Sequence, residues 1–304
     1  MQQPRRAPAQ RIGPYTVITR LDPTGPGAPP VPEHRFIARS ADGDRTSVVS
    51  VPLDDAASAR FLVEAEAAAR CRLGPWFAPV TECAEPGLPG WCARPYLPAV
   101  PLPTALTVHG GPLPDDTLRA LGICLAETLA TAHASGLAYA GVSPASVLLA
   151  ADGPRLTCFG AVRTAAEDGR PRSGLPGLEP GSLPPEQATG GRPWPPGDVY
   201  ALGAVLAYAA TGHTVPDRDE LPAMLRSLVL ACLSRDPAAR PRAVDVLQAL
   251  APHSPASPTP SPVATVLDSA AEAHRMRLPG RVIAAIAQQS ASVLAADVRP
   301  PLGS

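Results

Sequence analysis

The chain has 304 residues, of which 45% are hydrophobic and 17% are charged, so it can bury the core of one large or two small domains. Its formal net charge of -1 provides no basic field that would attract nucleic acid. No apolar run approaches the roughly 20 residues of a membrane span, and the N-terminus lacks the apolar segment of a signal peptide. Its six cysteines have no C-x-x-C spacing, which excludes the usual zinc patterns. We therefore expect a cytoplasmic protein without membrane insertion and without nucleic-acid binding.

The first part of the chain is predicted to be mainly β-structure. Residues 1–12 are expected to form a disordered lead. Short runs of β-forming residues follow within residues 15–53, and a Pro/Gly-rich stretch interrupts them. Residues 57–72 are rich in Ala and Glu and predict one helix, and residues 91–97 predict a further strand. Residues 13–98 are thus predicted to form a small β-rich unit.

Helical patterns dominate residues 99–251. Leu118, Leu121, Leu125 and Leu129 recur at the spacing of one helix face. A turn signal at residues 152–153 lies between two short apolar runs and predicts a hairpin. Further helices are predicted at residues 198–211, 221–234 and 243–250, the first of them apolar on all sides and therefore buried.

The C-terminal part is predicted to be a linker followed by a tail. Residues 252–263 are rich in Ser and Pro, which is typical of an extended linker. Within the tail, residues 264–304, one face of an amphipathic helix is marked by Val282, Ile283, Ile286, Val293 and Leu294. An isolated helix of this length is marginal, so the apolar stripe is expected to dock on the helical unit, pair with another copy or bind a partner. A frayed, disordered tail is the alternative.

Several segments resemble, in order, the motifs of actinobacterial serine/threonine protein kinases. The run Gly-Val-Ser-Pro-Ala-Ser-Val-Leu-Leu at residues 141–149 is similar to the catalytic loop, and Cys-Phe-Gly at 158–160 is similar to the D-F-G turn. The motifs Pro-Pro-Glu at 184–186 and Gly-Asp-Val-Tyr at 197–200 follow at the family's spacing. This resemblance, over residues 11–252, implies an α+β, two-lobed kinase-like fold with an N-lobe at 13–98, a larger helical C-lobe at 99–251 and an added tail helix.

The resemblance places different residues at every chemical position of the family. The strand lysine is Ser50, the catalytic base is Gly141, the loop lysine is Ser143, the metal-binding Asn is Ser146 and the metal-binding Asp is Cys158. A thiol is a poor ligand for a hard cation such as Mg²⁺, and a glycine accepts no proton. We therefore expect no catalytic residue, no metal site, and ATP/Mg binding that is absent or very weak.

A remnant of the nucleotide pocket is expected from the same resemblance. It would contain Glu64, Arg94, Leu97 and Phe159. Glu64 matches the helix glutamate whose lysine partner is missing, and Arg94 matches the position that guards the back of the pocket. We predict that Arg94 reaches Glu64 and fills part of the cavity.

Three further positions match residues that hold the family's fold. Glu186 and Arg240 match the pair that ties the activation segment to the C-lobe, and Asp198 matches the residue that anchors the catalytic-loop backbone. The alternative interpretation is that Glu186 and Arg240 are ordinary surface charges. Residues that hold the fold are thus retained where residues that perform the chemistry are replaced.

The sequence therefore predicts a pseudokinase that is not an enzyme and that acts by interaction, regulation or scaffolding. Its expected partner is an unidentified protein, with an active kinase or an envelope-associated protein as candidates. The alternative is a divergent serine/threonine kinase that still binds ATP and transfers phosphate with non-standard residues. A third hypothesis is a metal-independent nucleotide sensor that binds through the segment between the lobes alone. A thermal shift with Mg-ATP, compared with ATP and EDTA, separates the three.

Overall fold

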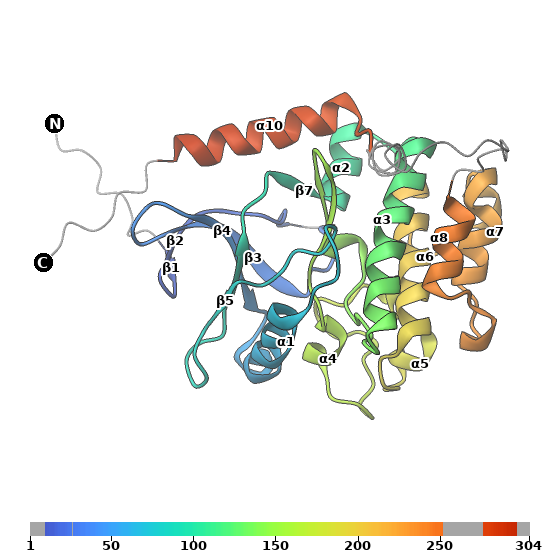
Figure 1. The fold of residues 1–304 in the computed structure, drawn as a ribbon, viewed down its shortest axis with the longest axis horizontal. Helices are drawn as coiled ribbons and strands as arrows, with labels where there is room; N and C mark the ends of the chain where they lie inside the picture. The colour runs from blue at the N-terminus through green and yellow to red at the C-terminus, as the bar shows by residue number, and fades with distance from the viewer. Residues whose placement is uncertain (1–9, 26, 252–275, 297–304) are drawn as a thin grey trace, which may run out of the picture.

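A computed structural model describes residues 10–25, 27–251 and 276–296. A six-stranded antiparallel sheet forms the smaller of two lobes, in the order β1-β2-β3-β4-β6-β5 (Figure 1). Its strands are β1 (Arg11–Ile12), β2 (Tyr15–Arg20), β3 (Glu33–Ser40), β4 (Thr46–Pro52), β5 (Glu82–Cys83) and β6 (Cys92–Pro95). Helix α1 (Ser58–Arg70) buries Phe61, Leu62, Ala65 and Ala68 and faces the larger lobe.

The larger lobe is mostly helical and adds a small sheet of three strands. These are β7 (Ala99–Pro101), β8 (Val147–Ala150) and β9 (Gly153–Leu156). The helices are α2 (Leu102–His109), α3 (Asp115–Ala134), α4 (Ala161–Ala165), α5 (Pro185–Ala188), α6 (Pro195–Thr211), α7 (Ala223–Cys232) and α8 (Ala243–Leu250). Short 3-10 turns lie at Asp55–Ala57, Pro144–Ser146, Pro180–Ser182, Arg218–Glu220 and Pro237–Ala239. The predicted two-lobed α+β architecture is confirmed.

Local sequence explains the elements that position the cleft between the lobes. Helix α6 is buried along nearly its whole length, because apolar side chains surround it on every side. The β8–β9 hairpin turns just before Gly153, which has a φ of +143°. A Cβ atom at Gly153 would lie 2.3 Å from the Trp76 ring, so only glycine fits there.

The tail forms helix α10 (Gly280–Ala295), which confirms the predicted amphipathic helix. Val282, Ile286 and Val293 are buried, whereas Ile283 is 40% exposed and Leu294 is 77% exposed. The buried positions differ by four and seven residues and share one face, while Ile283 and Leu294 lie one residue further around the helix. The apolar stripe is therefore narrower than predicted. The predicted linker, residues 252–263, lies outside the described residues.

Within the ranges that the structure describes, no helix is both long enough and apolar enough to cross a membrane.

Arg240 and Glu186, which the sequence analysis paired, tie α5 to the segment before α8. The Arg240 guanidinium donates to the two carboxylate oxygens of Glu186 at 2.6 and 2.9 Å. The Arg240 side chain is fully buried and lies over the Tyr200 ring, 5.0 Å from its centroid. A buried bidentate pair of this kind fixes the segment that carries α5 against the helical core.

We predict that Glu186→Gln flattens the acid dependence of folding. Burial raises the pKa of Glu186, but hydrogen bonding and charge from Arg240 outweigh burial and hold the pKa below its ordinary value of 4.5. A depressed pKa gives stability that is complete above the unfolded value and is lost as pH falls through the folded value. Urea unfolding between about pH 5 and about pH 3 should show a smaller fall in the free energy of unfolding for Glu186→Gln than for the wild type.

Glu85→Gln is the control for this measurement, because Glu85 is exposed and its side chain makes no hydrogen bond in the described structure. It should keep the wild-type dependence on pH. An unchanged dependence in Glu186→Gln would contradict a depressed pKa at that position.

Candidate functional site

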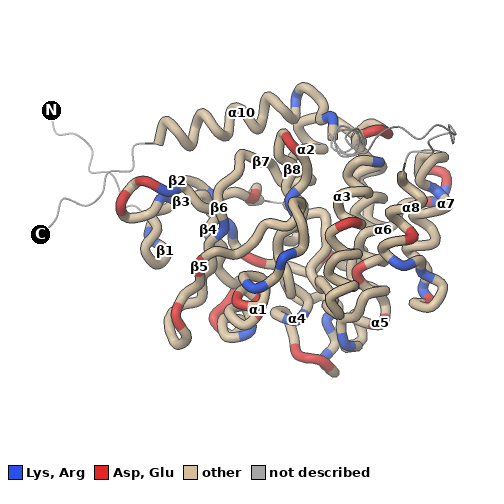
Figure 2. The backbone as a smooth tube through the Cα atoms, viewed as in Figure 1, with Lys and Arg blue, Asp and Glu red and all other residues tan. Residues whose placement is uncertain are grey.

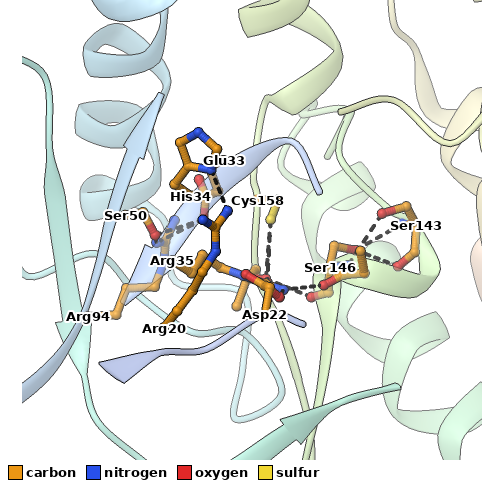
Figure 3. A network of polar contacts seen from close by, with 12 residues as sticks. Arg20, Asp22, Glu33, His34, Arg35, Ser50, Arg94, Ser143, Ser146 and Cys158 are labelled. Carbon is orange, nitrogen blue, oxygen red and sulfur yellow. Dashed lines mark hydrogen bonds and ion pairs between the residues drawn. The ribbon is translucent and has the colours of Figure 1, made fainter. Parts of the chain in front are cut away.

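The cleft between the lobes collects the chemical positions that the sequence analysis identified. Ser50 lies on β4, Ser146 precedes β8, and Cys158 follows β9. All three side chains are buried. Figure 3 shows them around a network of charged groups, several of which come from β3 and from the loop after β2.

Arg35 of β3 is the centre of this network, and none of its side chain is exposed. It forms a two-pronged ion pair with Asp22, in which Nε lies 2.9 Å from Oδ2. Nη1 of Arg35 donates to the Thr157 hydroxyl at 3.0 Å, and Nη2, which also bonds to Asp22, donates to the Ala145 carbonyl at 2.8 Å. Burial opposes the charge on Arg35, but the Asp22 carboxylate outweighs burial and raises the pKa of Arg35. One guanidinium thus joins the sheet, the loop after β2 and the larger lobe.

Arg35 also lies directly opposite Ser50 in the register of β3 and β4. Directly opposite residues of antiparallel strands place their side chains on the same face. The cleft therefore holds a cation beside the position where the strand itself carries Ser50. Sequence reasoning missed Arg35, although its alternation with Ile37 and Arg39 marks one face of the strand.

A second buried cation, Arg94 of β6, interacts with Ser50. The Arg94 guanidinium donates to Ser50 Oγ at 2.9 Å and lies 3.4 Å from Glu33 Oε1. The Ser50 hydroxyl donates to the same Glu33 oxygen at 2.9 Å. Arg94 Nε is buried without a hydrogen-bond partner among the described residues. Glu33, Ser50 and Arg94 therefore form one connected group at the back of the cleft.

The predicted pairing of Arg94 with Glu64 is wrong. Glu33 lies on the same sheet as Arg94 and offers a nearer carboxylate. Glu64 of α1 is instead bound at both oxygens, at 2.7 Å each, by Arg163 of α4. The Arg163 guanidinium also lies over Phe159, 5.2 Å from the ring centroid. The α1 glutamate is thus held by α4 and not by a group on the sheet.

The remaining positions of the expected pocket differ in their surroundings. Leu97 lies in the segment between the lobes and is 38% exposed. Phe159 is buried and makes edge contacts with Tyr139 and Phe77, whose ring centroids lie 5.2 and 6.4 Å away. These rings belong to the main apolar core, which continues from the large lobe to α1.

The loop at residues 139–146 is anchored through hydrogen bonds to its backbone. Asp198 accepts hydrogen bonds from the backbone N–H groups of Tyr139 and Ala140, at 2.7 Å each. A Cβ atom at Gly141 would lie 1.9 Å from the Cys158 carbonyl oxygen. Any side chain at this position therefore requires the backbone to move. The position assigned to the catalytic base is therefore closed to a carboxylate in this conformation.

The positions assigned to metal ligands do not fit Mg²⁺. The Ser146 hydroxyl donates to the Ser143 carbonyl and accepts from the Ser143 N–H, at 2.8 Å each. Burial raises the pKa of the Cys158 thiol to about 12, so it is neutral at physiological pH. Mg²⁺ prefers carboxylate and water oxygens, and the described residues contain no cluster of three His, Cys, Asp or Glu side chains that could hold a metal.

Side chains fill most of the cleft in this conformation. The space between Glu33, Glu64, Arg94 and Cys158 is a cavity of about 10 Å³. Such a volume holds a single water at most. A ligand larger than water therefore requires the groups around this cavity to move.

Comparison with known proteins places the chain among bacterial protein kinases. No family model matches it. It is 36% identical over 274 residues to the probable serine/threonine-protein kinase PkwA of Thermomonospora curvata, a match that covers 83% of this chain and 36% of that protein. It is 32% identical over 266 residues to the serine/threonine-protein kinase AfsK of Streptomyces coelicolor, covering 80% of this chain and 32% of that protein. The chain thus spans about a third of the length of these relatives.

Solved structures share the fold. The crystal structure of the Mycobacterium tuberculosis PknI kinase domain is similar with a TM-score of 0.59 and 22% sequence identity, and the match covers 81% of this chain and 97% of that one. A mutant form of the same kinase domain gives a TM-score of 0.60 at the same identity. At this identity the likeness establishes the two-lobed fold alone.

The comparisons contradict the prediction that this chain is not an enzyme. Relatives of moderate identity over most of the chain are named serine/threonine protein kinases. The replaced residues at 50, 141, 146 and 158 had supported the opposite view, because motif positions were judged by residue type alone. That judgement left out Arg35, which brings a cation into the cleft from the strand next to Ser50.

We predict that Asp22→Ala strongly destabilises the fold, because it leaves Arg35 buried without its carboxylate. Removing one member of a buried ion pair costs about 3–5 kcal/mol. Urea unfolding should show a loss of this size. The double variant Asp22→Leu/Arg35→Met removes both charges and should recover part of the loss.

Asp152→Ala is the matched control, because Asp152 pairs with Arg155 at 2.7 Å while its side chain is 63% exposed. An exposed pair contributes less than about 1 kcal/mol. Equal, small losses in Asp22→Ala and Asp152→Ala would contradict a stabilising role for the buried pair.

Proposed function

Since this chain belongs to the serine/threonine protein kinase family of actinobacteria, we propose that it is a divergent kinase domain that binds ATP and transfers phosphate with non-standard residues. The observation that carries the proposal is the buried guanidinium of Arg35, opposite Ser50 and inside the cleft. The relatives are named as kinases, and their names motivate the activity proposed for this chain. The unidentified protein partner expected from the sequence would then be the phosphate acceptor, in the cytoplasm.

Arginine is well suited to replace the family's strand lysine as a phosphate ligand. Phosphoryl transfer depends mostly on positioning and on stabilisation of charge over the phosphate oxygens. The planar guanidinium binds carboxylate and phosphate with the same two-pronged geometry. Arg35 already holds the Asp22 carboxylate in that geometry, so a phosphate group would take the place of Asp22. Arg94 lies on the other side of Ser50 as a second cation.

The described residues supply no base at position 141 and do not fit Mg²⁺, so the proposed transfer relies on neither. A loose transition state leaves the protein little covalent chemistry to perform. Each missing electrostatic group still costs roughly 10²–10³ in rate. We therefore expect transfer that is slow and that depends on Arg35.

We predict that Arg35 recognises phosphate and not the base. With the 304-residue chain in EDTA, calorimetric titration should show that Arg35→Met weakens ATP binding about tenfold to a hundredfold, the usual effect of a charged hydrogen bond. Adenosine binding should not change. Asp22→Asn removes the competing carboxylate and should tighten ATP binding. Arg45→Met, at an exposed arginine outside the cleft, should alter neither ligand.

Transfer of labelled γ-phosphate to a mixture of protein substrates tests the catalytic part. Label should appear slowly with the wild type and fall to background in Arg35→Met, with thermal unfolding confirming that the variant is folded. Arg35→Lys, which keeps the charge without the planar fork, serves if Arg35→Met does not fold. Absence of ATP binding in both the wild type and Asp22→Asn would contradict the proposal and agree with the ATP/Mg prediction made from the sequence.

A further inference from the structure

Helix α10 lies across both lobes along one edge of the molecule (Figure 1), and Val282, Ile286 and Val293 on its apolar face are buried. Just before the helix, the Arg277 carbonyl accepts a hydrogen bond of 2.6 Å from Thr117 of α3. Near its other end, the Val293 carbonyl accepts one of 3.1 Å from Arg39 of β3. The helix also packs against α2 and β7. It therefore connects the larger lobe to the sheet of the smaller lobe, independently of the segment between the lobes.

Val293 enters an apolar cluster that both lobes build. Only 2% of Val293 is exposed, and its neighbours in the cluster come from the loop after β2, from β3 and β4, and from β7 and β8: Leu21, Ile37, Val48, Ala99, Leu148 and Ala150. Between Val282 and Ala295 the helix carries no charged residue, and Figure 2 shows this stretch in tan throughout. Its inward face is thus matched to an apolar site.

Gln289, one turn before Val293, binds the segment between the lobes. Its side-chain oxygen accepts from the backbone N–H of Ala99 at 3.3 Å and lies 3.4 Å from the Tyr96 hydroxyl. The helix therefore brings an apolar side chain and a hydrogen-bond acceptor to the same end of the cleft.

Three chain segments connect this apolar cluster to the polar part of the cleft around Arg35. Ile37 follows Arg35 by two residues, Val48 precedes Ser50 by two, and Leu148 follows Ser146 by two. On β3 and β4 these pairs share a face and lie about 7 Å apart, as residues two apart in a strand do. The cleft thus has a polar end at Arg35 and an apolar end at Val293. A nucleotide whose phosphates lie at Arg35 would direct its flat base toward the apolar end.

We propose that α10 is an autoinhibitory strap, which keeps the apolar end of the cleft closed by docking Val293 and Gln289 there. Its competition with a nucleotide base rests on the function proposed above, whereas closure of the cleft does not. A free helix of this length is marginal in water, so α10 loses order when it undocks. The conformational entropy that the chain then gains favours the undocked state. That compensation makes the docked state reversible.

The test compares Val293→Asp with Leu294→Asp in the full chain. Both changes replace an apolar side chain of α10 by a carboxylate, but Val293 is buried and Leu294 is 77% exposed. Each variant also carries Ala99→Cys, a small change at a buried position under the helix, as a reporter of access to the cleft. Maleimide labelling of residue 99 is measured for its own peptide by mass spectrometry. It should be roughly 5- to 150-fold faster with Val293→Asp than in the chain that carries Ala99→Cys alone, which is the usual range for coupling between two sites. Leu294→Asp should leave the rate unchanged.

Hydrogen exchange and titration complete the test. Amides of α10 should exchange faster in Val293→Asp while those of α3 and α6 keep their protection, and adenosine and ATP should bind more tightly by a similar factor. Faster labelling without nucleotide binding in any variant would overturn the proposed kinase function and support the strap. If α10 undocks by hydrogen exchange while labelling and nucleotide affinity stay unchanged, the strap is overturned.

Discussion

The packing of the cleft depends on the buried guanidinium of Arg35, which bonds to residues of both lobes. A charge removed from water is tolerated only when its hydrogen bonds are made elsewhere. Arg35 finds its partners on three separate segments, at Asp22, Ala145 and Thr157. The loop after β2 and the large lobe are therefore tied to one strand of the sheet. Any change that opens the cleft must first supply other partners for this charge.

The two ends of the cleft are closed by different physical means. At the polar end Asp22 neutralises Arg35, and at the apolar end α10 covers the cluster with Val293. The polar contact is specific for an anion, because only a group with two acceptor oxygens matches the guanidinium. The apolar contact is less selective and is weakened by the order that a short helix must acquire. A molecule with a phosphate at one end and a flat ring at the other would replace both contacts together.

The fold could be predicted from the sequence, because it depends on ordered motifs and on periodic apolar residues. The buried helix α6, the β8–β9 hairpin and the tail helix all carry such signals. The Glu186–Arg240 pair was predicted because both residues belong to motifs, but the charge pairs of the cleft could not be predicted, because each side chain's partner there depends on strand register and on neighbouring helices. Glu64 is bound by Arg163, and Arg94 is bound near Glu33, although the motif had suggested that Glu64 and Arg94 pair with each other. Burial of Val293 next to an exposed Leu294 likewise depends on how the helix docks.

Residue identity at a motif position and the chemistry available in a cleft are separate properties. Ser50 carries no charge, yet the residue opposite it on β3 is an arginine whose side chain shares its face. The charged side chain of the site can thus be supplied by the neighbouring strand in place of the strand that carries Ser50. Position 141 cannot carry a carboxylate in this conformation, because a Cβ atom there would collide with the Cys158 carbonyl. Charge stabilisation is therefore the property that this cleft can retain, and proton transfer by a loop carboxylate is the one that its backbone excludes.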